Sequence, residues 1–464
     1  MLPTALLQST LAAALRTGGD FAEVFVEDRR TSAASLDDGK VEELSSGRAR
    51  GAGIRVVVGQ TTGFAHTADL SQVGMLAAAH AAAAAARSGG GGTVVADLGV
   101  RDVRNASTMG IDPASIGKAD KVALLHKADA AGRAGRHAIK QVSASVADVR
   151  RRIQVANSDG LLASDDQVRT RFGVSAVASG DTGMQTGSQS RGATMGWELF
   201  DEIDIEELAH IAAEQAISKL AAQPAPSGPM PVILAAGGGG VLFHEACGHG
   251  LEADLIAKKM SVFAGRVGEK VASELVTLVD DGGVGGAWGT FGIDDEGAPA
   301  QRTTLIEDGV LTDYMWDLLR ARKEGRTSTG NGRRETYKHL PMVRMTNTFL
   351  TPRGDTTLDD LIAGTARGVY CKQLSGGQVN TATGDFVFGM TEAYLIEDGK
   401  ITAPLRSANL IGNGPRALGD IDGVANDFNM GSPGTCGKDG QGVPVGMGIP
   451  SVRVAQLTVG GTAS

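Results

Sequence analysis

A proline-rich stretch near the middle of the chain is the feature that most constrains how its 464 residues can fold. The segment QPAPSGPMP (223–231) combines prolines with small polar residues, a composition typical of a linker between domains. A chain of this length is also too long for one ordinary hydrophobic core. We therefore place a domain boundary near residue 225 and expect two domains, residues 1–222 and 223–464.

The first of these regions mixes helical and strand patterns. Apolar residues recur at helical spacing from Leu2 to Arg16, and FAEVFVEDRR (21–30) then alternates apolar and polar residues like a strand. The same reasoning predicts helices at 70–87, 113–138 and 201–222, and strands at 142–155 and 169–178. Residues 1–222 should thus form a mixed α/β domain.

Beyond residue 225 glycines interrupt the sequence more often, and the helical periodicity of apolar residues becomes weaker. The chain holds 66 glycines, about twice the usual share, which indicates many tight turns. Residues 304–315 and 394–405 share the sequence LIEDG, and an Asp-Gly pair between apolar runs is a strong hairpin signal. We expect two hairpins in one sheet system, a β-rich second domain and an α+β fold overall.

Composition and charge exclude several classes of protein. The formal net charge is −9, and no block of lysine or arginine suits a nucleic-acid backbone. The first residues lack the layout of a secretory signal, and no apolar run is long enough to span a membrane. Only three cysteines occur, which fits a reducing compartment. We expect a cytoplasmic protein that has no disulfide and binds neither nucleic acid nor membrane.

The segment PVILAAGGGGVLFHEACGHGLEADLI (231–256) carries the most chemical information. A strand pattern leads into four glycines and then into a stretch with two histidines around a glutamate, His244, Glu245 and His249. Strand, glycine turn and helix also describe a phosphate loop, but the Gly-Lys-Ser/Thr ending of such loops is missing. The better interpretation is a metallopeptidase helix, in which two histidines bind zinc and a glutamate activates the water molecule.

The spacing of the two histidines is unusual for such a helix. In H-E-x-x-H the ligands are four residues apart and share a face, whereas His244 and His249 are five apart, or about 140° around a regular α-helix. Either a one-residue π-type bulge or termination of the helix at Gly248 would let both rings reach one ion.

A catalytic zinc usually takes three protein ligands and leaves one position for water. The third ligand has five candidates, which are Cys247, Glu252, Asp254, His339 and Cys436. Cys247 would strain the backbone if it bound the ion together with both histidines, and a small buried residue is the more ordinary role for it. Spacing alone does not choose among the others.

Three segments resemble the TldD branch of the TldD/PmbA peptidase family: HEACGHGLEAD, LPMVRMTNT and the ending CGKDGQGVPVGMGIPSVRVAQLTVGGT. The resemblance implies that His244, His249 and Cys436 hold the metal and that Glu245 is the catalytic residue. It further implies a two-domain TldD/PmbA-like fold, a peptide substrate in extended, unfolded form, and a dimer. The second subunit would be a PmbA/TldE-like partner or a second copy of the chain.

The expected chemistry follows from these residue types. Zn²⁺ would lower the pKa of bound water and polarise the scissile carbonyl, and Glu245 would act as the general base. Tyr337 and His339 have suitable chemistry for oxyanion stabilisation, although a packed tyrosine and a hydrogen-bonded histidine are the more ordinary roles for these residues. Two other readings stay open: a metal-binding scaffold or partner subunit without turnover of its own, and an enzyme that matures a modified peptide.

Overall fold

The computed structural model describes residues 1–86, 94–103, 107, 109–406 and 408–461, and its fold belongs to the expected α+β class. The first half contains, in chain order, α1 (Thr4–Leu15), β1 (Phe21–Asp37), β2 (Lys40–Val58), β3 (Thr61–Thr67), α2 (Gln72–Ala85), β4 (Gly99–Val100), a 3₁₀ turn (Pro113–Ser115), α3 (Lys118–Arg133), β5 (Ile139–Asn157), β6 (Leu161–Gly180), β7 (Gly183–Ala193), α4 (Leu199–Glu202) and α5 (Ile205–Leu220).

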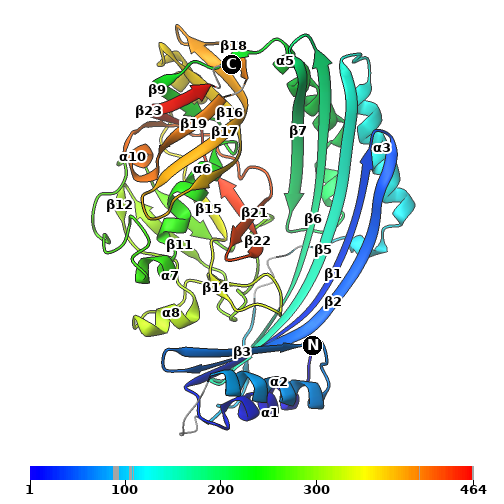
Figure 1. The fold of residues 1–464 in the computed structure, drawn as a ribbon, viewed down its shortest axis with the longest axis vertical. Coiled ribbons are helices and arrows are strands. Elements are labelled where there is room, and N and C mark those ends of the chain that lie inside the picture. Colours follow the sequence, from blue (N-terminus) through cyan, green and yellow to red (C-terminus); the bar gives the residue numbers. More distant parts are fainter. Residues whose placement is uncertain (87–93, 104–106, 108, 407, 462–464) are drawn as a thin grey trace.

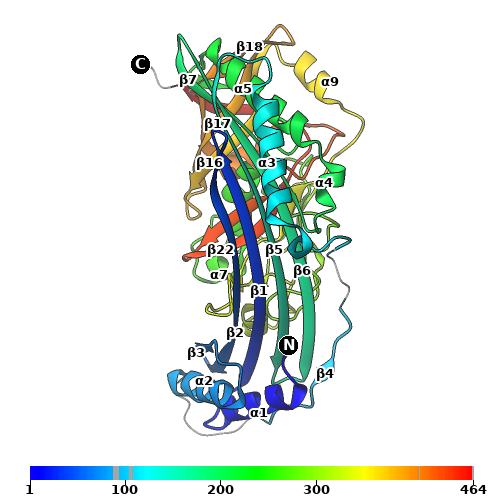
Figure 2. The same cartoon turned by 90° about the vertical axis from the view of Figure 1, so that its right-hand side faces the viewer.

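A seven-stranded sheet, called the large sheet below, organises this first half. Its strand order is β3-β2-β1-β5-β6-β4, and β7 pairs with β6. Helices α1 and α2 cover one end of the sheet, while α3 and α5 cover the other end (Figures 1 and 2). The second half of the chain lies against the opposite face of the sheet (Figure 1).

The second half is rich in strands. It contains β8 (Gln223–Pro224), β9 (Gly228–Leu234), α6 (Gly240–Phe243), a π-helical turn (His244–Gly248), a 3₁₀ turn (His249–Leu251), α7 (Ala253–Ala257), β10 (Leu278–Asp281), β11 (Arg302–Glu307), β12 (Val310–Leu311), α8 (Leu318–Lys323), β13 (Gly332–Arg333), β14 (Met342–Val343), β15 (Asn347–Leu350), α9 (Leu358–Ala363), β16 (Arg367–Val379), β17 (Asp385–Glu397), β18 (Lys400–Arg406), β19 (Ala408–Asn413), α10 (Gly414–Gly419), β20 (Ile421–Val424), β21 (Gly434–Lys438), β22 (Gln441–Gly448) and β23 (Val452–Gly461).

Two main sheets form this half. One has the order β12-β11-β10-β15-β22-β21, which makes β21 an edge strand. The other has the order β16-β9-β23-β19-β17-β18-β8, and because β16 also pairs with β17, five of its strands close into a ring. The largest apolar cluster of the protein fills the space around these sheets.

Buried ion pairs join the large sheet to the second half. Glu23 of β1 accepts hydrogen bonds from Arg55 of β2 at 2.6 Å and from Arg334 at 2.5 Å. Arg55 also donates to Glu296 at 2.8 Å. Side chains from both halves of the chain form this interface network: Glu23, Glu27, Arg55, Arg151, Asp295, Glu296 and Arg334. Each half therefore supplies counter-charges that the other half needs.

Several predictions of local structure need correction. The two LIEDG hairpins both form, but β11–β12 belongs to the six-stranded sheet and β17–β18 to the eight-stranded one, so they do not share a sheet. The expected linker 223–231 is not a free connector, because β8 and the start of β9 pair with β18 and β23.

The predicted helices differ from the observed ones mainly at their ends. The expected helix 113–138 is shorter, since the extended backbone at Gly117 separates the 3₁₀ turn from α3. The expected helix 201–222 is divided at Asp204, which caps α5 by accepting hydrogen bonds from two backbone N–H groups. The end of the expected helix 70–87 lies outside the described residues. No helix within the described ranges is long and apolar enough to cross a membrane.

Candidate metal centre

A π-helical turn brings His244 and His249 together. The backbone N–H of His249 donates to the carbonyl of His244, five residues earlier, as in a π-helix. The two imidazole rings lie 5.2 Å apart between centroids, at an angle of 79°. Of the two backbone solutions that the spacing allows, the chain adopts the π-type bulge.

The side chain of Cys436 meets this pair from β21, far along the sequence. Its Sγ lies 3.3 Å from Nε2 of His249, and the ligand atoms of His244, His249 and Cys436 all lie within 4.8 Å of one another. All three residues are buried. Arg344, from the LPMVRMTNT segment, fixes the β21–β22 hairpin by donating to the carbonyls of Cys436 and Gln441.

The electrostatics of this cluster fit a metal ion. Both ring nitrogens of His244 are buried without a hydrogen-bond partner among the described residues, which is rare in folded proteins and typical of a ligand. Burial opposes ionisation of the Cys436 thiol, but the charges of His244 and His249 prevail and lower its pKa to about 4. Two imidazoles and a thiolate are common ligands of zinc.

Glu252 orients His249 rather than joining the ligand cluster. Its Oε2 lies 3.0 Å from Nδ1 of His249, which leaves Nε2 of the ring facing Cys436. Lys438 donates to Glu252 at 2.8 Å, and despite burial the nearby positive charges of His249 and Lys438 lower the pKa of this carboxyl to about 2. Histidine ligands of metals usually have such a partner on the second nitrogen.

Lys438 was missed from the sequence, although a signal for it exists. It follows Cys436 by two residues on β21, and residues two apart in a strand share one face of the sheet. Its ammonium also donates to Asp254 at 2.8 Å and to the carbonyl of Val343 at 3.1 Å. Asp254, another candidate for the third ligand, thus serves to hold Lys438.

Glu245 is placed differently from the three buried residues. Its side chain is 28% exposed, and its Oε2 lies 3.7 Å from Nε2 of His249. The carboxylate is therefore next to the cluster and also accessible from solvent. A group that exchanges protons with a bound substrate needs both properties.

The remaining candidates lie in other surroundings. Cys247 is fully buried in the main apolar cluster, and desolvation raises the pKa of its thiol. Nδ1 of His339 lies 2.9 Å from the hydroxyl of Thr336. Tyr337 packs in an apolar cluster with Phe25 and Ile293, against the large sheet.

The π-helical turn depends on a glycine at position 248. A Cβ there would lie 2.1 Å from Sδ of Met345, so Gly248→Ala should overpack the core beneath the turn. We expect a loss of about 1–3 kcal/mol in the free energy of unfolding, together with weaker metal binding. Denaturant unfolding and zinc titration measure the two effects.

Gly437→Ala is the matched control, because a Cβ at that position, beside Cys436, meets no atom within 4 Å. Met345→Ala in the Gly248→Ala background should restore metal binding by removing the clash. Wild-type stability and zinc affinity in Gly248→Ala alone would show that the turn tolerates a side chain and that this account of it is wrong.

Comparison with known proteins places the whole chain in one family. Sequence profiles match residues 22–88 as PmbA/TldA metallopeptidase domain 1, residues 111–220 as the central domain and residues 227–461 as the C-terminal domain. The Metalloprotease TldD homolog of Haemophilus influenzae is 41% identical, over 96% of this chain and 93% of that protein. A metalloprotease of Methanothermobacter thermautotrophicus is 38% identical, over 96% of each chain.

Solved structures share the fold over nearly the full length. TldE from Thermococcus kodakarensis superposes with a TM-score of 0.78 at 20% identity, covering 98% of this chain and 100% of its own. A Thermotoga maritima chain has a TM-score of 0.82 at 23% identity and covers 98% and 99%. The relatives that match nearly the full chain are metalloproteases. The chain belongs to the PmbA/TldD metallopeptidase family.

Proposed function

We propose that this chain is a zinc-dependent peptidase in which His244, His249 and Cys436 hold the metal and Glu245 is the general base. The observation that carries the proposal is the buried cluster of three ligand atoms, one of them on an imidazole without a hydrogen-bond partner among the described residues. A structural zinc is usually closed by four protein ligands, whereas this cluster has three. Three ligands leave room for water or substrate.

Each residue of the site has a distinct part in hydrolysis. Zinc, when bound, supplies a Lewis acid that polarises a carbonyl and makes water acidic near neutral pH. Glu245 takes a proton from the attacking water and passes it to the leaving amine. Glu252 and Lys438 keep the ring of His249 in a fixed orientation, and Arg344 keeps Cys436 in place.

We further propose that the active unit is a dimer with a PmbA/TldE-like partner, or with a second copy of the chain. An exposed edge of the large sheet supports this proposal. Residues 40–50 of β2 are exposed along their length, and within the part of the chain that the structure describes they pair with β1 alone, since the pairing of β3 with β2 begins at Ala52. A free strand edge of this length invites pairing with another chain.

The dimer would also enclose the site, and a cytoplasmic peptidase of broad specificity needs such enclosure to spare folded proteins. We also propose that the chain is divided into two domains, residues 1–222 and 223–464, and that the protein is cytoplasmic. The break between the profiles of the central and C-terminal domains, at residues 220–227, supports the division.

A cleavage assay tests the proposal directly. The zinc-loaded chain, alone and mixed with a candidate partner subunit, should hydrolyse a denatured protein much faster than the same protein in its folded state, because only the unfolded chain binds in extended form. Mass spectrometry of the products and light scattering of each mixture give the activity and the assembly. Equal rates on folded and denatured substrate, or full activity of a monomer, would contradict the enclosure argument.

A further inference from the structure

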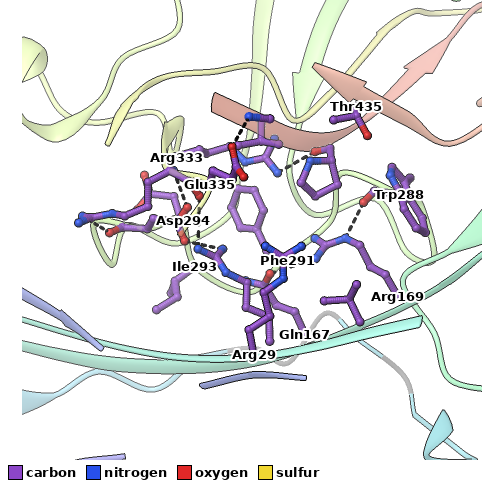
Figure 3. A pocket seen from close by; sticks show the side chains of 17 residues that line it. Arg29, Gln167, Arg169, Trp288, Phe291, Ile293, Asp294, Arg333, Glu335 and Thr435 are labelled. Atoms are coloured by element: carbon purple, nitrogen blue, oxygen red, sulfur yellow. Dashed lines mark hydrogen bonds and ion pairs between the residues drawn. The ribbon is translucent and has the colours of Figure 1, made fainter. Parts of the chain in front are cut away.

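A cavity of about 150 Å³ lies between the large sheet and the second half of the chain. Arg29 and Arg169 reach it from strands of the large sheet, while Arg333 lies on the opposite side (Figure 3). Trp288 and Phe291 form part of an apolar wall, and Thr435 of β21 completes the lining near the metal centre. The cavity is therefore cationic on several sides and apolar on another.

Arg169 and Arg333 carry buried charges, and no carboxylate among the described residues forms an ion pair with either of them. Arg169 is 5% exposed and Arg333 is 4% exposed, and neither forms an ion pair with a described residue. Arg169 donates to the carbonyls of Trp288 and Thr290 and to Gln167, and Arg333 donates to the carbonyls of Met345 and Pro444. These bonds fix both guanidinium groups and leave further N–H donors on each of them.

The pKa values agree with this picture. Burial, together with the charge of Arg333, lowers the pKa of Arg169 to about 9. Burial likewise lowers the pKa of Arg333 to about 10. Asp165 and Asp295 raise the pKa of Arg169, and Asp295 and Asp280 raise that of Arg333, but burial outweighs these carboxylates at both sites. A bound anion would therefore stabilise the charged form of both arginines.

Arg29 adds a third guanidinium. Its Nε is buried and has no hydrogen-bond partner among the described residues. It pairs across the sheet with Arg151, and like charges directly opposite each other are unfavourable. Arg151 is neutralised by Glu27 at 2.6 Å and Asp295 at 2.8 Å, whereas Arg29 forms no ion pair with any described residue.

The acidic residues that line the cavity already have partners. Asp294 accepts three backbone N–H groups, and burial raises its pKa to about 7. Asp295 binds Arg151 and the backbone N–H of Arg334, and Glu335 accepts from the backbone N–H of Gly442. The arginines are thus the groups left to bind a ligand.

We propose that this cavity binds a carboxylate of the peptide substrate, which deepens the proposed function and rests on it. Guanidinium groups bind carboxylates through paired, charge-assisted hydrogen bonds. A cavity of about 150 Å³ holds a group the size of benzene, so the apolar wall has room for one side chain beside the carboxylate.

The cavity is also well placed for a substrate. Thr435 lines it, and the next residue is Cys436, whose sulfur contacts His249. Neighbouring residues of a strand point to opposite faces, so the cavity and the metal centre lie on the two sides of β21. A peptide held by its carboxylate in the cavity can pass the free edge of β21 and reach the metal centre with residues nearer its amino end.

Peptide binding to the zinc-loaded full chain tests this assignment. We would use Glu245→Gln, in which turnover is removed, and follow the anisotropy of a peptide labelled at its amino end. One unstructured peptide without acidic side chains is prepared with a free C-terminal carboxylate and with a C-terminal amide. A third version is amidated and carries one internal glutamate.

At least one carboxylate peptide should bind about tenfold or more tightly than the neutral peptide. If the amidated peptide with the internal glutamate binds more tightly than the neutral peptide, the cavity accepts a side-chain carboxylate. If only the peptide with the free C-terminus binds more tightly, the cavity accepts the C-terminal carboxylate. Arg29→Gln should remove the preference. Arg30→Gln, the same change on the next residue of β1, should keep it, because Arg30 is exposed and lines a different cavity.

Equal affinity for the three peptides, no binding of any of them, or the same loss in both arginine variants would overturn the assignment. Comparison of peptides in the Glu245→Gln chain does not depend on how the arginine variants fold. A carboxylate preference without cleavage by the wild-type chain would keep the cavity assignment and reject the peptidase.

Discussion

Glu245→Gln is expected to reduce peptide hydrolysis by about a hundredfold to ten-thousandfold, the usual contribution of a general base. The amide keeps the size of the carboxylate but cannot accept the proton of water at neutral pH. Because Glu245 lies beside the cluster and is partly exposed, its replacement should leave His244, His249 and Cys436 in place. Zinc content and the unfolding midpoint should therefore match those of the wild type.

The comparison that isolates this role is Glu274→Gln, an exposed glutamate in the same half of the chain. It makes the same change of charge and should retain full activity. Loss of zinc from Glu245→Gln would mean that the residue is a ligand, and wild-type turnover would remove it from the mechanism.

Cys436→Ser is expected to weaken zinc binding by more than about a hundredfold. Changes to groups that only orient a metal ligand already cost about ten- to a hundredfold in affinity, and Cys436 is proposed as a ligand itself. The serine hydroxyl stays protonated near neutral pH, whereas the Cys436 thiol has a pKa of about 4 beside the two imidazoles. Competition with a chromophoric chelator gives the affinity, and peptide hydrolysis should fall with zinc occupancy.

The same replacement at Cys247 separates a ligand from a core residue. Cys247 lies between the two histidines in sequence, yet its side chain packs in the apolar cluster. Cys247→Ser should lower the free energy of unfolding and keep the zinc affinity. If the two variants lose zinc equally, the loss comes from general destabilisation, and Cys436 is not distinguished as a ligand.

The sequence was most informative about the local geometry of the site. A separation of five residues between His244 and His249 is incompatible with one face of an α-helix, and so it predicted an irregular backbone. The chain forms a π-helical turn there. The meeting of this turn with β21 depends on sheet pairings far apart in sequence, and for that reason Cys436 was suggested by family resemblance rather than by spacing.

Long-range packing explains what the sequence did not indicate. In β1, alternation predicted one apolar face and one polar face, which usually means a strand with one side in water. The apolar side packs against α1 and α2. The polar side carries Glu23 and Glu27, which are both fully buried because the second half of the chain covers them. Only the partner charges, supplied by distant residues, make this burial tolerable.

The interface network also limits how this protein can be rearranged in evolution. Domains that join through small polar surfaces are readily exchanged between genes. Here a new neighbour for the second half would have to supply counter-charges for Glu296 and Arg334 at once, because a buried ion that loses its partner costs about 3–5 kcal/mol. The second half is therefore tied to its own sheet, and shuffling of either half alone should be strongly disfavoured.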